Sequence, residues 1–137
     1  MCVVRLGHIK ITIIILKYKG QNVAVLGCGR SGQAAARLAR REGALVTVFD
    51  DGDSGNLHSV VTGLRADGCS GLIGHEALAA DVAGFDLAII SPGIALDQEL
   101  AGRFACAGIS IIGEMEFAFP FCSARIVGVT GTNGKTT

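Results

Sequence analysis

Short apolar runs alternate with segments of helical spacing along most of the chain. Runs that end at glycine or a polar residue predict buried parallel strands, because both faces of such strands are covered. They comprise residues 22–26, 45–49 and 87–90, two shorter runs at 70–74 and 109–112, and a last run at 125–129. Segments whose apolar residues recur every three or four positions predict helices at 31–43, 57–68, 75–85, 97–108 and 114–119.

Glycine, proline and aspartate predict where several of these helices begin or end. Gly43 stops the first helix, and Gly63 interrupts the weak second one. Asp97 caps the fourth helix, and Pro120 breaks the last one. Strands and helices that alternate through short connections predict an α/β fold: a Rossmann-like parallel sheet with helices on both faces.

The first 19 residues form an atypical apolar extension. Residues 13–16 are the longest apolar run, with Lys10 and Lys17 nearby. A membrane-spanning helix needs about 20 mostly apolar residues, so this segment is too short and too charged. A signal peptide would need a small-residue cleavage site, and none precedes Gly20. Residues 11–15 form either an additional strand or an upstream extension without function, and the sequence leaves both open.

Composition narrows the class of protein. The 137 residues are half apolar, contain 20 glycines, and carry 12 basic and 12 acidic side chains. Balanced charge predicts no nucleic-acid partner and no membrane surface as partner. Five cysteines without a C-x-x-C pair exclude a disulfide framework and a zinc site. We expect buried, reduced thiols in a cytoplasmic protein.

The segment "GCGRSG" follows a predicted strand and opens a predicted helix. Gly27 permits a tight turn, Gly29 lets a diphosphate approach the backbone, and Gly32 lets helix and strand pack closely. The helix N-terminus offers free N–H groups, and Asp50 ends the next strand. The segment predicts a site for a dinucleotide or another nucleotide diphosphate. A glycine turn kept for packing alone is the alternative.

The sequence closes on a second glycine-rich loop, "GTNGKTT". A strict Walker A motif requires glycine at the position of Val129, and here glycine stands at 131 instead. Backbone N–H groups of such a loop surround phosphates, the lysine reaches the terminal phosphates, and a threonine ligates magnesium. The loop predicts ATP binding through Gly131, Thr132, Asn133, Gly134, Lys135, Thr136 and Thr137, with Thr136 as the Mg²⁺ ligand. A surface turn with a solvated lysine is the alternative.

These motifs together resemble the Mur ligases, which build the peptide of bacterial cell-wall precursors. "GVTGTNGKTT" resembles their ATP loop, with the shortened glycine spacing. "VAVLGCGRSGQAAARLARREGALVTVFDD", "ISPGIALDQEL" and "GISIIGEMEFAF" are similar to the N-terminal domain of the branch that adds D-glutamate. The resemblance covers about residues 19–137. The alanine-adding branch typically has a G-x-G-G-x-G-M turn, and folylpolyglutamate synthases lack a Rossmann-like domain before the loop.

The resemblance implies a substrate site for UDP-N-acetylmuramoyl-L-alanine. Gly29, Arg30, Ser31 and Gly32 would face the diphosphate. Asp50 and Asp51 would approach the uridine, and a second loop would lie near the diphosphate and sugar; this loop consists of Ser91, Pro92 and Gly93. Glu114 and Glu116 are expected to be solvated helix carboxylates without a chemical role.

The resemblance also implies the reaction. ATP phosphorylates the substrate carboxylate, and the amine of D-glutamate then attacks the acyl phosphate. Lys135 and Thr136 would serve catalysis through charge stabilisation and magnesium. We expect a monomeric, inactive fragment: a UDP-substrate domain at 20–120 and the start of an ATP-binding central domain at 121–137. The alternatives are an NAD-binding module of a dehydrogenase or regulatory protein, and a truncated gene product.

Overall fold

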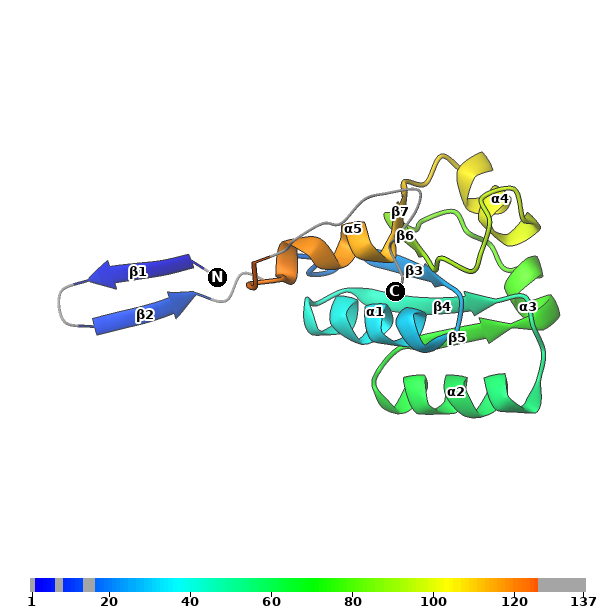
Figure 1. The fold of residues 1–137 in the computed structure, drawn as a ribbon, viewed down its shortest axis with the longest axis horizontal. Coiled ribbons are helices and arrows are strands. Elements are labelled where there is room, and N and C mark those ends of the chain that lie inside the picture. Colours follow the sequence, from blue (N-terminus) through cyan, green and yellow to red (C-terminus); the bar gives the residue numbers. More distant parts are fainter. Residues whose placement is uncertain (1, 7–8, 14–16, 126–137) are drawn as a thin grey trace, which may run out of the picture.

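A five-stranded parallel sheet in the order β5-β4-β3-β6-β7 forms the centre of the molecule (Figure 1). The computed structural model describes residues 2–6, 9–13 and 17–125. The strands of this sheet are β3 (Asn22–Leu26), β4 (Leu45–Asp50), β5 (Ser70–Ile73), β6 (Leu87–Ile90) and β7 (Ile111–Gly113). The chain moves outward from β3 to β5 and then returns to the other side of β3 with β6. This reversal places a switch point at the carboxyl ends of β3 and β6, where ligands of open α/β sheets bind.

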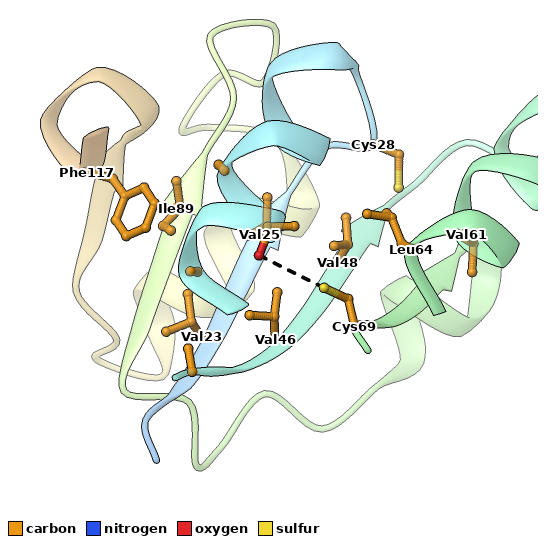
Figure 2. Packing of buried hydrophobic residues seen from close by; sticks show 14 of the residues in the cluster. Val23, Val25, Cys28, Val46, Val48, Val61, Leu64, Cys69, Ile89 and Phe117 are labelled. Carbon is orange, nitrogen blue, oxygen red and sulfur yellow. Dashed lines mark hydrogen bonds between the residues drawn. The ribbon is translucent and has the colours of Figure 1, made fainter. Parts of the chain in front are cut away.

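Helices cover both faces of the sheet, as the sequence predicts. The helices are α1 (Arg30–Arg41), α2 (Gly55–Ala66), α3 (Gly74–Ala79), α4 (Glu99–Cys106) and α5 (Glu114–Ala118). Val23 and Val25 of β3 pack in one buried cluster with residues of α1, α2 and α5 (Figure 2). The intervening Ala24 and Leu26 pack in a second cluster with residues of α3 and α4. Because successive strand residues point to opposite faces, the two clusters identify the two covered faces. The Rossmann-like α/β prediction is confirmed.

The beginning of the chain forms a separate antiparallel hairpin. Strands β1 (Cys2–Leu6) and β2 (Ile9–Ile13) pair with each other and lie apart from the main sheet (Figure 1). The strand expected at 11–15 therefore overlaps β2, while residues 14–16 lie outside the described part. Tyr18 already contacts the main domain: its N–H donates to the Glu42 carbonyl at 3.1 Å. Among the described residues, none of the helices has the length and apolar character that spanning a membrane requires.

Two predicted helix signals are wrong. Helix α2 is continuous through Gly63 and starts earlier than predicted, at Gly55, because the Ser54 side chain accepts from the Leu57 N–H at 3.3 Å. A helical glycine costs only about 1 kcal/mol relative to alanine, and the burial of neighbouring Val61 outweighs that cost. Helix α4 begins at Glu99 with Gln98 as its N-cap, so Asp97 lies outside the helix and does not cap it.

Two other helices differ in extent from the prediction. Helix α3 ends at Ala79, well short of residue 85, because the Arg103 guanidinium donates to the carbonyls of Ala77 and Leu78 at the end of the helix. At the other end of the domain, α5 ends at Ala118, one residue short of the predicted end and just before Pro120. Pro120 itself lies inside a 3₁₀ turn, η1 (Phe119–Phe121), which follows α5 directly. Proline fits there because its missing N–H is not needed in the first helical turn.

The prediction of uniformly buried cysteines holds for two of the four whose surroundings are described. Cys28 and Cys69 are buried, whereas Cys106 and Cys122 are exposed, and all four are free thiols. The Cys69 thiol lies 4.0 Å from the carbonyl of Ala36 in the core around α1 (Figure 2). The exposed pair follows from position: Cys106 is the last residue of α4, and Cys122 follows η1.

Candidate functional site

The turn between β3 and α1 contains three glycines, and at two of them a side chain would not fit. Gly27 has a φ of 108°, which disfavours any residue with a side chain, and its N–H donates to the Phe49 carbonyl at 2.7 Å. A Cβ on Gly27 would lie 2.9 Å from Ser91 Oγ. A Cβ on Gly32 would lie 2.0 Å from the carbonyl oxygen of Gly27. These contacts agree with the predicted roles of tight turning and of helix–strand packing.

Gly29 differs from its two neighbours in the motif because it faces open space. A Cβ there would meet no atom of the described chain within 4 Å, and the residue is exposed. Gly29 is also the N-cap of α1, where no side chain of the described residues caps the helix. Arg30 and Ser31 follow it and are both exposed. Free N–H groups, the positive end of the helix dipole and open space together suit an anionic ligand group.

Asp50 connects this turn to the loop after β4. Its Oδ2 accepts from the Cys28 N–H at 2.8 Å, and its Oδ1 accepts from the Gly52 N–H at 3.0 Å. Both carboxylate oxygens are therefore engaged with backbone amides, although each retains a lone pair. Asp51 is exposed and lies beside Asp50 at the same sheet edge. The structure thus brings Asp50 next to the glycine turn and gives it a supporting contact that the sequence did not reveal.

The Cys28 thiol is buried, and it stays protonated at neutral pH. Burial raises the pKa of Cys28 to about 11, and the negative charge of Asp50 adds to the shift. A thiol with such a pKa is a poor nucleophile at neutral pH. Cys28 therefore contributes packing beneath the turn rather than chemistry.

The loop after β6 meets the glycine turn from the other side. Ser91 is buried, its N–H donates to the Leu26 carbonyl at 3.0 Å, and its hydroxyl donates to Oε1 of Glu114. Pro92 and Gly93 are exposed. The predicted loop is thus present at the same edge as the turn, with Ser91 directed inward and the next two residues directed outward.

Glu114 corrects one expectation. It was expected to be solvated, but its exposed fraction is 9%, whereas Glu116, two residues later, is exposed as expected. Helical spacing did not identify the buried residue, because its partner Ser91 lies 23 positions away in the chain. The position of Glu114 directly after β7, at the edge where the ligand loops gather, is the signal that sequence reasoning missed.

A cavity of about 350 Å³ opens between the loop after β6 and the start of α5. Ser91 and Glu114 are among the residues that line it, and the lining is mostly apolar. The lining residues are Ile90, Ser91, Pro92, Ile94, Leu96, Ile111, Gly113, Glu114 and Met115. The cavity extends the sheet-edge site beyond the glycine turn.

The predicted ATP-binding residues 131–137, including Lys135 and Thr136, lie outside the described residues, as does most of the strand predicted at 125–129. In the described part of the chain, no three His, Cys, Asp or Glu side chains gather in a way that could hold a metal ion. The structure therefore brings the residues of the first predicted site to one edge of the sheet; their binding of a ligand stays a prediction, as does the second site.

Comparison of the sequence with known proteins identifies relatives of this chain. No family model matches the chain. The chain is 43% identical over 124 residues to the UDP-N-acetylmuramoylalanine–D-glutamate ligase of Ligilactobacillus salivarius, covering 90% of this chain and 27% of the relative. It is 43% identical over 120 residues to the ligase of that name from Anaeromyxobacter dehalogenans, covering 87% of this chain and 26% of the relative. The chain is homologous to a part of the UDP-N-acetylmuramoylalanine–D-glutamate ligases.

The chain spans about a quarter of the length of these D-glutamate ligases. Other members resemble it to a similar degree, such as the ligase of Lactococcus lactis, which is 37% identical over 123 residues. Among solved structures, a shikimate 5-dehydrogenase from Mycobacterium fortuitum is 22% identical with a TM-score of 0.49, covering 75% of this chain and 48% of that chain. The resemblance to Mur ligases found in the sequence motifs is confirmed.

Proposed function

We propose that this chain provides the UDP-substrate-binding part of an ATP-dependent ligase that joins D-glutamate to UDP-N-acetylmuramoyl-L-alanine. The observation that supports it most is the open space over Gly29 at the start of α1, next to two packed glycines. Loops from β4 and β6 border the same edge of the sheet. This arrangement suits a nucleotide diphosphate that lies across the switch point.

Each side chain then has a role in holding the substrate. The diphosphate would rest on the first N–H groups of α1, with the exposed Arg30 and Ser31 as additional donors. Asp50 and Asp51 would lie toward the uridine, where the remaining lone pairs of Asp50 can accept from a ribose hydroxyl. The exposed backbone of Pro92 and Gly93 would border the sugar.

The catalytic half of the proposal rests on the sequence of the ATP loop. Lys135 would stabilise charge on the terminal phosphates and Thr136 would ligate Mg²⁺, which supplies electrostatic stabilisation to phosphoryl transfer when bound. D-Glutamate would be held by the remainder of a full-length ligase. We expect the 137-residue chain to be a cytoplasmic, monomeric part that forms no amide by itself. Incorporation of D-glutamate by this chain alone would contradict that expectation.

Isothermal titration calorimetry with UDP tests the binding proposal. Arg30→Ala should weaken UDP binding at least about tenfold, because a hydrogen bond to a charged group contributes about 1.5–3 kcal/mol. Asp50→Ala should weaken it as well, since the amides of Cys28 and Gly52 lose their common acceptor. Arg41→Ala is the matched control, because Arg41 is an exposed arginine at the opposite end of the same helix.

Two results would overturn the proposal. One is the absence of UDP binding by the parent chain at millimolar concentration. The other is tighter binding of NADH than of UDP, which would favour a nicotinamide-binding module. A narrower part of the proposal fails if the Arg30→Ala and Arg41→Ala variants bind UDP equally well, because the diphosphate then does not lie at the start of α1.

A further inference from the structure

We propose that Glu114 is a positioning residue for the nucleotide site. It acts through the Ser91 hydroxyl, which it holds beneath the glycine turn, and thereby fixes the loop whose exposed residues border the ligand. The inference rests on the proposed function for the identity of the ligand. Its geometric part, the fixing of the loop, stands on the contacts of the unliganded chain.

Ser91 occupies the space that two glycines leave free. Its Oγ lies 2.9 Å from the position of a Cβ on Gly27 and 3.0 Å from that of a Cβ on Gly32. The hydroxyl thus packs against both ends of the turn at once. Because the Ser91 hydroxyl packs there, a displacement of the loop after β6 would disturb the turn after β3.

The buried hydroxyl requires an acceptor. Ser91 has an exposed fraction of 7%, and its single O–H donates to Oε1 of Glu114, which is itself 9% exposed. A buried donor that loses its partner costs about 1–3 kcal/mol. Removing the carboxylate would therefore favour any rearrangement that brings the Ser91 hydroxyl to water, and the cavity beside both residues gives it a route.

The ligand-facing residues depend on this anchor. On one side, the Ser91 N–H donates to the Leu26 carbonyl at 3.0 Å; on the other, the Ile94 N–H donates to the Ser91 carbonyl at 3.0 Å. Pro92 and Gly93 lie between these bonds and are exposed. Because the Glu114 carboxylate accepts from the Ser91 hydroxyl, it influences the ligand through the loop.

Amide hydrogen exchange and UDP titration of the 137-residue chain test the proposal together. In Glu114→Ala, exchange at the Ser91 and Ile94 amides should accelerate at least tenfold, and UDP should bind about tenfold more weakly, which corresponds to about 1.4 kcal/mol. Glu114→Gln should stay within about threefold of the parent in both measurements, because its amide oxygen still accepts from Ser91. Glu116→Ala, an exposed glutamate of the same helix, is the matched control and should change neither.

Ser91→Ala removes the same hydrogen bond from the other side and keeps the carboxylate. It should accelerate exchange at the Ile94 amide as Glu114→Ala does, and adding Glu114→Gln to it should weaken UDP binding no further. The proposal is overturned if Glu114→Ala matches Glu116→Ala in both measurements. Should Glu114→Ala fail to fold, unchanged exchange in Ser91→Ala overturns it equally. If the parent chain does not bind UDP, the proposed function is wrong, while the exchange data still decide the role of Glu114.

Discussion

Replacing Gly32 by alanine should destabilise the fold, whereas replacing Gly29 should leave the fold intact and impair ligand binding. The two glycines are three positions apart in one turn, so the pair separates packing from recognition. A Cβ at Gly32 would lie 2.0 Å from the Gly27 carbonyl oxygen, while ordinary contacts begin at 3.4 Å. A Cβ at Gly29 would meet nothing within 4 Å.

The clash at Gly32 sets the magnitude. The obstructing atom is the backbone carbonyl oxygen of Gly27, and the N–H of the same residue donates to the Phe49 carbonyl. The oxygen therefore cannot move aside as a flexible side chain would. Overpacking of a rigid site costs about 1–3 kcal/mol and occasionally more, and we expect Gly32→Ala to lie near the upper end. For a domain of this size, about 3 kcal/mol lowers the melting temperature by about 10 °C. Such a loss is a large share of a total stability of about 5–15 kcal/mol.

Gly29→Ala should behave oppositely. Its φ of −63° is accessible to alanine, and alanine is a poorer N-cap than glycine by up to about 1 kcal/mol, so the melting temperature should fall by at most about 4 °C. The added methyl group would occupy the space proposed for the diphosphate, and UDP affinity should therefore fall. Thermal unfolding followed by circular dichroism, together with UDP calorimetry, measures both effects. A Gly32→Ala chain that melts within about 3 °C of the parent, which corresponds to less than about 1 kcal/mol, would refute the packing argument.

The thiols give two further predictions and the helix caps give a third. At pH 8, iodoacetamide should modify Cys106 readily and Cys28 slowly, because the raised pKa of Cys28 leaves little thiolate; peptide mass spectrometry reads out both sites. Because the pKa of Cys28 is higher in the folded than in the unfolded chain, the unfolded chain releases the Cys28 proton more readily above pH 9. The fold should therefore lose stability as pH rises from about 9 towards about 11. Urea unfolding at pH 8 and pH 10.5 measures the loss. Ser54→Ala should destabilise the chain by about 1 kcal/mol in urea unfolding, whereas Asp97→Ala should have no such effect; the reverse order would contradict the caps assigned to α2 and α4.

The strands were predictable because burial on both faces leaves a direct record in the sequence. The apolar run at 22–26 coincides with β3, and the run at 87–90 coincides with β6. Helix ends were less predictable, since they depend on partners far along the chain. Helix α3 ends where Arg103 of another helix reaches its carbonyls, and no local signal at residues 79–85 announces that contact.

The site was predictable to the same extent. Each of the three glycines in "GCGRSG" is required for a distinct, local reason that the sequence indicates. The structure places Gly29 in open space and the other two in packed positions. The bonds of Asp50 to two backbone amides and the burial of Glu114 could not be inferred. Both depend on how β3, β4, β6 and β7 bring their carboxyl ends together, which is a property of the assembled sheet.

The double attachment of Asp50 bears on the speed of recognition. One carboxylate accepts from the Cys28 amide of the turn after β3 and from the Gly52 amide after β4, so it links the two loops. If a nucleotide binds there as proposed, it binds to loops whose ordering entropy was already lost during folding. Association should then proceed in a single kinetic phase at a rate governed by diffusional encounter and ionic strength.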